Sequence, residues 1–275
     1  MKRSRLMMVL VLGCLFLLQA NIALARVKVT ETIIKTFALT PNGDLSISNI
    51  NGRIRIESWN KDSVKVVAEK IVKTSSRERA KEYLKELRIE FDSGTDYLNV
   101  KPIYPKGLKN GWNFFDWLFG TGARADITVH FHLWVPRATN IESSSINGSS
   151  KISDVSGDIE SKATNGKITL KNVTGDISAK TINGRIEASI SDAGGLGSLV
   201  LKTINGSINL ELPKSAGGRI ELATVNGSIQ SDFPIEISGK ISKHKMRGRF
   251  GKGHSRIELS TINGAVRVTT LLREK

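Results

Sequence analysis

The sequence predicts an all-β protein that winds as a single-stranded parallel β-helix, a β-solenoid with about 18 residues per coil. Two observations carry this prediction. Glycines recur every nine residues at positions 148, 157, 166, 175 and 184, and the apolar residues between them agree from one unit to the next. Asn-Gly pairs such as Asn183-Gly184 recur along the chain at the ends of these units. Short strands with a turn on each side, repeated at fixed length, are typical of solenoids.

Each unit reads G-x-I-x-[LA]-x-x-[IV]-[NT], as in Ile168, Leu170 and Val173 after Gly166. Residues two and four positions after the glycine lie on one face of a strand. The third apolar residue comes at position seven, so the alternation slips by one, and we expect a bend that keeps it pointing inward. Asn-Gly supplies the second bend, because both residues tolerate positive φ. A meander of Asn-Gly hairpins is the alternative, but it leaves the slip unexplained.

The first 25 residues are typical of a secretory signal peptide. Lys2, Arg3 and Arg5 precede an apolar run from Leu6 to Leu18, and Ala23-Leu24-Ala25 fits a small-x-small cleavage site. We expect an exported protein, periplasmic or at the cell surface. The residues around Cys14 weakly resemble a lipoprotein processing site. Lipidation is the weaker alternative, because apolar residues follow Cys14.

Composition indicates an ordered, basic protein. The chain has 275 residues, with 41 Lys and Arg against 26 Asp and Glu, a formal net charge of +15. Hydrophobic residues at 39% and charged residues at 24% are ordinary for a soluble globular protein. A single cysteine excludes a disulfide framework and a cysteine-based zinc site. We expect one domain over residues 26–275.

The nine-residue unit is interrupted between residues 60 and 140. Residues 63–72, 87–91, 96–101 and 125–136 are predicted strands, and the last of them alternates cleanly from Ile127 to Val135. Ser75 and Glu78 suggest a capping box for a short helix over 76–88. An open solenoid needs its ends covered, so we expect this insert to close one end.

A dense aromatic segment lies in the glycine-flanked stretch 107–122. An exposed patch of this density is typical of a partner, glycan or membrane surface. The alternative is that the segment folds back over the end of the solenoid and is buried. The candidate binding residues here are Trp112, Phe114, Phe115, Trp117 and Phe119.

The strongest charge run spans residues 240–256, which hold no Asp or Glu. Because the chain is expected to be exported, we expect an anionic envelope polymer, an acidic polysaccharide or lipid headgroups as partner, and no nucleic acid. The alternative is a solvated loop. The candidate binding residues are Lys243, Lys245, Arg247, Arg249 and Lys252.

No catalytic motif is present: G-x-S-x-G, H-E-x-x-H and G-x-x-x-x-G-K-[ST] are all absent. His130 and His132 form an H-x-H pair on the outer face of a predicted strand, but the sequence offers no third ligand for a metal. We therefore expect no catalytic residues, no metal and no cofactor. A polysaccharide-modifying β-helix enzyme is the alternative.

The chain resembles the bacterial putative-adhesin family of exported β-solenoid proteins, which includes adhesin-like domains of unknown function. The residues that carry the resemblance are Thr181-Ile182-Asn183-Gly184-Arg185-Ile186, its counterpart at 203–208, Trp59, Trp134-Val135-Pro136 and the loop at 248–253 before Asn263-Gly264. The resemblance covers nearly all of residues 30–270. It implies a right-handed β-helix at the cell envelope and brings no catalytic residues.

We therefore expect a non-enzymatic binding or scaffolding protein of the cell envelope. A solenoid presents long side walls of repeated polar residues, which suit an extended or repetitive partner. Beside the polysaccharide-modifying enzyme, a second alternative is a membrane-proximal sensor or accessory that touches lipid through residues 112–119.

Overall fold

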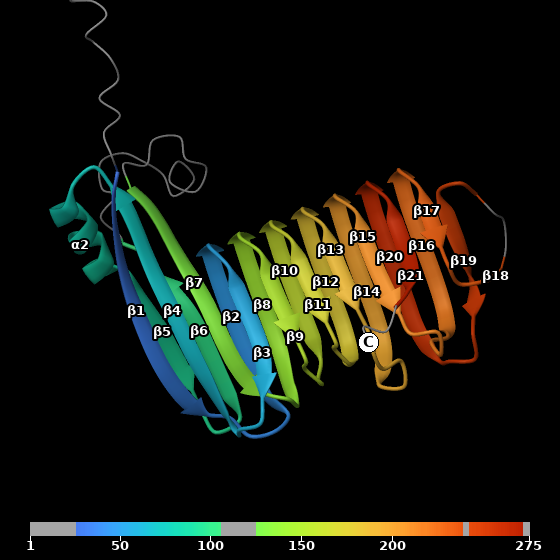
Figure 1. Cartoon of the computed structure of the whole chain (residues 1–275), viewed down its shortest axis with the longest axis horizontal. Helices are drawn as coiled ribbons and strands as arrows, with labels where there is room; N and C mark the ends of the chain where they lie inside the picture. Colours follow the sequence, from blue (N-terminus) through green and yellow to red (C-terminus); the bar gives the residue numbers. More distant parts are fainter. Residues whose placement is uncertain (1–25, 106–124, 239–241, 272–275) are drawn as a thin grey trace, which may run out of the picture.

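The computed structural model describes residues 26–105, 125–238 and 242–271, which form an all-β structure with one helix (Figure 1). The predicted signal peptide, Cys14 and the aromatic segment at 112–119 lie outside these residues. No helix in the described part of the chain is long and apolar enough to cross a membrane. The elements are β1 (Val27–Ala38), β2 (Gly43–Asn51), β3 (Ile54–Trp59), β4 (Ser63–Thr74), α2 (Arg77–Glu86), β5 (Arg88–Ser93), β6 (Tyr97–Ile103), β7 (Ala125–Pro136), β8 (Thr139–Asn147), β9 (Ser150–Ser153), β10 (Ile159–Asn165), β11 (Ile168–Lys171), β12 (Gly175–Asn183), β13 (Ile186–Ser189), β14 (Leu196–Asn205), β15 (Ile208–Leu212), β16 (Gly218–Asn226), β17 (Ile229–Ser231), β18 (Glu236–Ile237), β19 (Lys245–Phe250), β20 (Ser255–Asn263) and β21 (Val266–Thr270).

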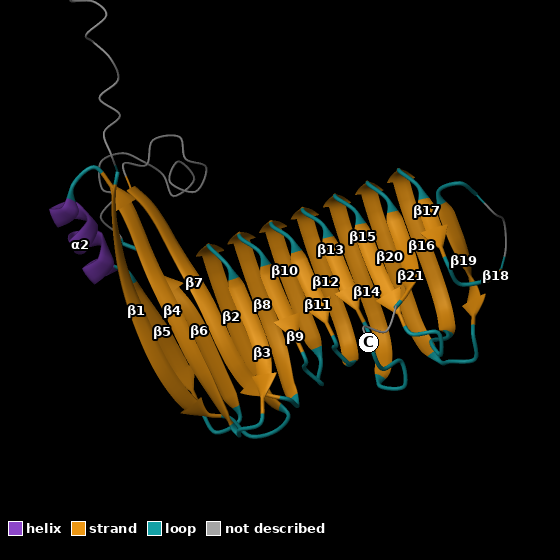
Figure 2. Cartoon of the chain, viewed as in Figure 1, coloured by secondary structure: helices purple, strands orange, loops and turns teal. Residues whose placement is uncertain are grey.

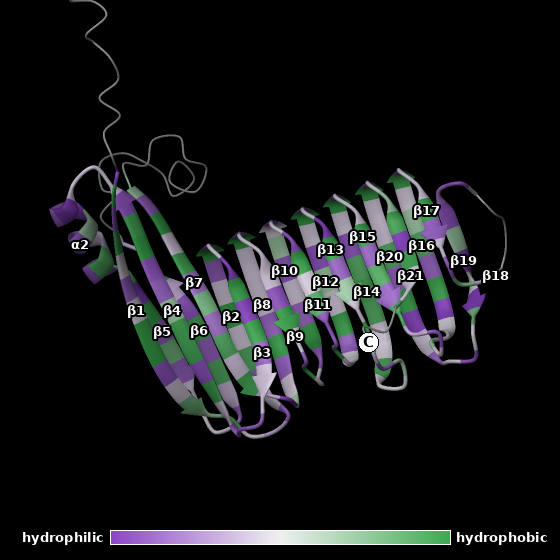
Figure 3. Ribbon diagram, viewed as in Figure 1, coloured by the Kyte–Doolittle hydropathy of each residue, from purple (hydrophilic) through white to green (hydrophobic). Residues whose placement is uncertain are grey.

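The strands form two large sheets that lie one behind the other along the molecule (Figure 2). The ten-stranded sheet has the order β1-β4-β7-β3-β9-β11-β13-β15-β21-β17. The eleven-stranded sheet has the order β18-β19-β16-β20-β14-β12-β10-β8-β2-β6-β5. One continuous cluster of buried Ile, Leu, Val and Ala side chains lies between them. Hydrophobic and hydrophilic residues alternate along the strands, as a sheet with one buried face requires (Figure 3).

The middle of the molecule is a parallel stack of two-strand rungs, each with one strand in each sheet. Ile141, Ile159 and Ile177 lie opposite one another on β8, β10 and β12. Ser150, Ile168 and Ile186 do the same on β9, β11 and β13. The step from one rung to the next is 18 residues here, as predicted, and lengthens to 22 at β14.

The corner after each long strand is an Asn-Gly pair packed tightly on the rung below. A Cβ placed on Gly166 would lie 1.9 Å from the carbonyl oxygen of Gly148, so no side chain fits. The opposite corner follows the short strand, where Asp154 and Asn172 adopt left-handed φ values of 63° and 52°. Val173 turns inward and is buried after that corner, as the predicted bend requires.

The bend predicted before the third apolar residue of each unit is absent from the long strands, so this prediction is wrong for them. β12 runs straight, so Ile177, Ala179 and then Thr181 point inward, and Ile182 turns outward with 44% of its surface exposed. A polar residue can replace Ile at the inner position because Thr181 Oγ1 donates to the carbonyl of Gly166 at 3.2 Å. The outward aliphatic residues form a column on neighbouring strands: Ile182, Ile204, Ile262 and Val225.

Both sheets are mixed, so the prediction of purely parallel pairing does not hold for the whole chain. β4 pairs antiparallel with β1 and with β7, because the 60–140 insert contributes β4 and β7 as long alternating strands that run in opposite directions. β19 pairs antiparallel with β16 at the other end, because residues 245–250 run back along that strand. The rungs also leave chain order, since β20 inserts between β14 and β16.

The insert extends both sheets beyond β2 and β3, and α2 packs at that end against β1 and β4. The helix begins after Ser76, whose hydroxyl accepts from Arg79 N, so the cap lies one residue after the predicted Ser75. Ala80 and Leu84 are buried, as the apolar stripe predicts. Lys70 on β4 is only 4% exposed and donates to the carbonyls of Leu84 and Leu87, both at 3.0 Å.

Candidate functional site

The outer face of the eleven-stranded sheet carries its polar side chains in rows that cross the strands. Parallel register places chemically equivalent positions of successive rungs side by side, about 4.8 Å apart. One such row runs from Asp44 on β2 to Arg249 on β19, and Tyr97 on β6 and Glu236 on β18 lie directly opposite these two residues. Between β2 and β19 the residues of this row are Asp44, Asn140, Asp158, Asp176, Ser198, Arg256, Arg219 and Arg249.

The acidic half of this row lines a groove of about 680 Å³ with Tyr97 and Glu142. Its side-chain oxygens are committed to the stack itself. Asp158 Oδ1 accepts from the backbone N–H of Asp176 at 3.1 Å, and Asp176 Oδ1 accepts from Ser198 N at 2.8 Å. Asp158 and Asp176 therefore each satisfy a backbone donor on the next rung, which gives this part of the groove a structural role.

The other half is a row of three arginines, Arg256, Arg219 and Arg249, which we call the arginine row. Arg219 on β16 lies directly opposite Arg256 on β20 and directly opposite Arg249 on β19. All three are exposed, because their neighbours Ile220, Ile257 and Phe250 fill the core. Like charges directly opposite one another on adjacent strands are destabilising. The strand register therefore concentrates positive charge on β20, β16 and β19 at a cost in stability, and Glu236 on β18 borders this charge directly opposite Arg249.

The arginine row lines a groove of about 440 Å³, together with Arg247, Glu221 and Glu258. The two glutamates have other cationic partners: Glu221 bonds Lys245 at 2.8 Å and Arg247 at 3.6 Å. The hydrogen bond from Lys245 outweighs partial burial and holds the pKa of Glu221 below its ordinary value.

Glu258 is likewise occupied, because it pairs with Lys202 at 2.5 Å. Within residues 26–105, 125–238 and 242–271, no ion pair involves Arg219, Arg249 or Arg256. The groove can thus offer three guanidinium groups, the side chain best suited to carboxylate, sulfate and phosphate groups.

The structure brings only one predicted binding residue, Arg249, into the arginine row. Lys245 and Arg247 lie on the same strand but are paired with Glu221. Lys243 and Lys252 are exposed on either side of β19. The predicted aromatic contact at 112–119 lies outside the described residues. Arg219 was not predicted because it lies 30 residues before Arg249; its place directly after Gly218 was the available signal.

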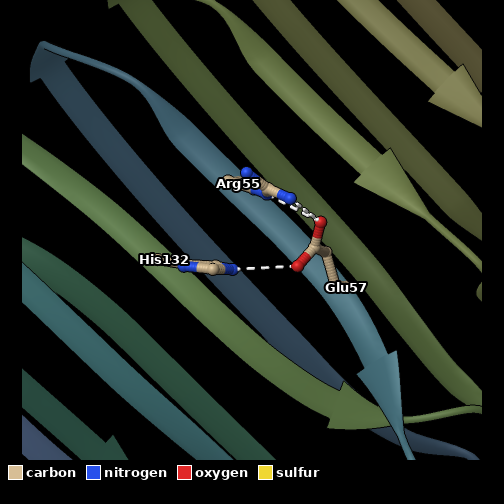
Figure 4. A network of polar contacts seen from close by, with 3 residues as sticks. All are labelled: Arg55, Glu57 and His132. Carbon is tan, nitrogen blue, oxygen red and sulfur yellow. Dashed lines mark hydrogen bonds and ion pairs between the residues drawn. The ribbon is translucent and has the colours of Figure 1, made fainter.

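A second polar cluster lies on the outer face of the ten-stranded sheet, where Glu57 on β3 bonds His132 on β7 at 3.0 Å (Figure 4). Arg55 Nε also donates to Glu57, at 2.7 Å. Partial burial opposes ionisation of Glu57, but the hydrogen bonds from Arg55 and His132 outweigh it and lower the pKa of this carboxyl. Trp134 stacks on His132 with ring centroids 3.7 Å apart.

The H-x-H pair divides between two partners. His130 accepts from the backbone N–H of Arg53 at 3.1 Å, whereas His132 bonds Glu57. In the part of the chain that the structure describes, no three His, Cys, Asp or Glu side chains come together in a way that could hold a metal ion. These histidines therefore bind other strands of the sheet.

No family model and no curated protein matches the chain. Among solved structures, it is similar to a "putative cell adhesion protein" from Clostridium sporogenes ATCC 15579, with 14% identity over 88% of this chain and 100% of that one, at a TM-score of 0.45. A "putative adhesin" from Bacteroides fragilis NCTC 9343 shows 10% identity over 88% and 97%, at a TM-score of 0.38. A "putative lipid binding protein" from Parabacteroides distasonis ATCC 8503 has a TM-score of 0.24 with 14% identity over 88% and 97%. None of the three TM-scores reaches 0.5, so these likenesses carry no conclusion about the function of the chain.

Proposed function

We propose that this chain is an exported, non-enzymatic, adhesin-like protein that holds an anionic polymer of the cell envelope or surface on its arginine row. The observation that carries the proposal is the direct opposition of Arg219 to both Arg256 and Arg249. An anionic group lying across these three strands would relieve the repulsion and gain charge-assisted hydrogen bonds.

We further propose that the stacked rungs form a β-solenoid, which suits an extended partner. The 18-residue steps between β8, β10 and β12 support this, because they repeat outward side chains at rung spacing. The stack also fixes the backbone positions of the arginines without help from a ligand, so no backbone entropy is lost in bringing them together on binding.

Export and envelope location rest on the predicted signal peptide of residues 1–25. Anionic glycans and phosphate-containing polymers are the ligands that such a compartment offers to arginines. Expression with and without residues 1–25, followed by cell fractionation, tests this part of the proposal. Protein retained in the cytoplasm when residues 1–25 are present would overturn it.

A pull-down from envelope extract tests the binding function. The bait is the purified chain, compared with the triple variant Arg219→Gln, Arg249→Gln and Arg256→Gln. The matched control removes equal charge elsewhere, through Lys171→Gln, Lys180→Gln and Lys214→Gln, three exposed lysines without an ion pair in the described residues. We expect an acidic polymer to be recovered by the native chain and the control and lost by the arginine variant. Recovery by all three alike would reject the arginine row.

The aromatic segment remains a separate proposed contact. Serine substitutions at Trp112 and Trp117 should weaken capture of a partner or of liposomes without changing the circular-dichroism spectrum. Loss of the folded spectrum would instead assign these side chains to the core.

A further inference from the structure

Strand β1 is a long edge strand. It has 12 residues and stands at the end of the ten-stranded sheet, where it pairs with β4 on one side; in the described part of the chain no strand pairs with its other side. Such an edge offers a row of backbone donors and acceptors to any strand that can match it. Charge and sequence decide which strand that is.

The sequence of β1 is complementary to itself when two copies run antiparallel with Ile33 at the centre. In this register Glu31 of each copy lies opposite Lys35 of the other, which gives two reciprocal pairs of opposite charge. Lys35 is exposed, with its Nζ 4.7 Å from the centroid of the Phe91 ring, and Glu31, which also bonds Lys70 at 2.8 Å, keeps 47% of its side chain exposed, so a partner strand can reach both. Opposite charges across a strand pair stabilise it, whereas like charges destabilise it.

The same register matches the remaining positions. Val29 lies opposite Phe37, and Ile33 opposite its own copy, so the half-buried side chains that face the core meet one another. On the outer face Thr30 lies opposite Thr36, and Thr32 opposite Ile34, whose side chain is 61% exposed. Moving the partner by two residues keeps the faces but places Glu31 opposite Ile33 or Phe37 and leaves both charges unmatched.

We propose that two copies of this chain associate through β1, by antiparallel pairing about a two-fold axis at Ile33, and so join their ten-stranded sheets into one. This inference is independent of the proposed anionic ligand, because the arginine row lies at the opposite end of the stack. A two-fold interface needs only one self-complementary surface, and β1 provides it. The dimer would present two arginine rows, which raises the affinity for a polymer that reaches both.

Cysteine cross-linking tests the pairing and its register. In a Cys14→Ser background, Ile33→Cys places two thiols across the axis, and we expect a short thiol cross-linker to give a covalent dimer. Thr32→Cys alone and Ile34→Cys alone should give no covalent dimer, because each thiol faces a residue without sulfur, whereas their mixture should cross-link. Cross-linking of all variants alike, or of none, would overturn the register.

Charge reversal tests the interface in solution. Lys35→Glu places Glu opposite Glu31 twice, and we expect sedimentation to show the dimer weakened roughly tenfold or more. Lys28→Glu is the matched control, since residue 28 lies opposite Ala38 and its reversal should leave the dimer intact. The proposal would be rejected if the native protein sedimented as a monomer at every concentration while its circular-dichroism spectrum showed that it was folded.

Discussion

Asn183 donates a side-chain hydrogen bond from Nδ2 to Oδ1 of Asn165, one rung below, at 2.8 Å. The same bond joins Asn165 to Asn147 at 2.9 Å and Asn205 to Asn183 at 2.8 Å. Each amide thus gives one bond and receives one, which forms a ladder along the corner of the stack. This ladder explains why the repeat ends in Asn-Gly: the glycine allows the close backbone approach and the asparagine links the rungs.

Replacing one member of the ladder should break two bonds at once. We expect Asn165→Ala to lower the free energy of unfolding by about 1–3 kcal/mol, since each bond contributes about 0.5–1.5 kcal/mol. Denaturant titration measures the change. Asn99→Ala is the control, because Asn99 makes an exposed bond to Asp92 outside the ladder, and its loss should be small. Equal effects of the two substitutions would contradict a ladder that stabilises the stack.

Gly166 should not tolerate alanine. The added Cβ would lie 1.9 Å from the carbonyl oxygen of Gly148, and backbone cannot move aside as a flexible side chain can. We expect Gly166→Ala to cost roughly 1–3 kcal/mol or more, measured as a lower midpoint of thermal or denaturant unfolding. At Gly194 the nearest atom would be Asp192 Oδ1 at 3.2 Å, so Gly194→Ala should be tolerated. A Gly166→Ala protein as stable as the native one would contradict the observed rung packing.

The repeat was predictable because it depends on local rules that the sequence displays directly. Glycine spacing indicated the 18-residue step, and alternation indicated β7 with its buried Phe131. The inward position of Thr181 was not predictable, because its bond to the Gly166 carbonyl exists only between rungs. The insertion of β20 between β14 and β16 was also hidden, since equivalent Asn-Gly units can stack in any order.

Lys70 should contribute strongly to the end of the molecule that holds α2. It is buried and donates to the carbonyls of Leu84 and Leu87, so Lys70→Met would leave both carbonyls without this donor. We expect a loss of about 1–3 kcal/mol in the free energy of unfolding. Lys73→Met removes an exposed pair with Asp126 at 3.8 Å and should cost under about 0.5 kcal/mol. The role assigned to Lys70 would be wrong if both variants unfolded at the same denaturant concentration.

His130 should make stability depend on pH. Burial and the positive charge of Arg53 lower its pKa below the ordinary 6.5. Other cations, Lys28 and Lys73, act in the same direction, and Glu69 opposes them. Below pH 6.5 the unfolded chain therefore binds a proton that the folded chain does not, so stability falls as the pH drops from 6.5 towards the folded pKa.

We expect His130→Gln to flatten this dependence in unfolding curves collected between pH 5 and 7. His254→Gln is the control, because His254 is exposed on the loop before β20. An unchanged slope in the His130 variant would assign the pH dependence to other groups.

The candidate site was only half predictable. The charge run at 240–256 indicated a basic surface and included Arg249, but Lys245 and Arg247 are paired with Glu221. Arg219 joins the row through the antiparallel register of β16 and β19, a long-range pairing that composition does not reveal. Sequence thus indicated the sign of the charge, and the strand register selects which arginines share the groove.

The most direct test of the proposed function is a binding titration of the purified protein with dextran sulfate and with neutral dextran, repeated over a range of ionic strength. We predict binding to the sulfated polymer alone, and a log–log salt slope that falls by about 2–3 when Arg219, Arg249 and Arg256 are changed to Gln. The lysine control, with Lys171, Lys180 and Lys214 changed to Gln, should keep most of the native slope and affinity. Equal losses in the two triple variants, or binding that ignores salt, would contradict the account.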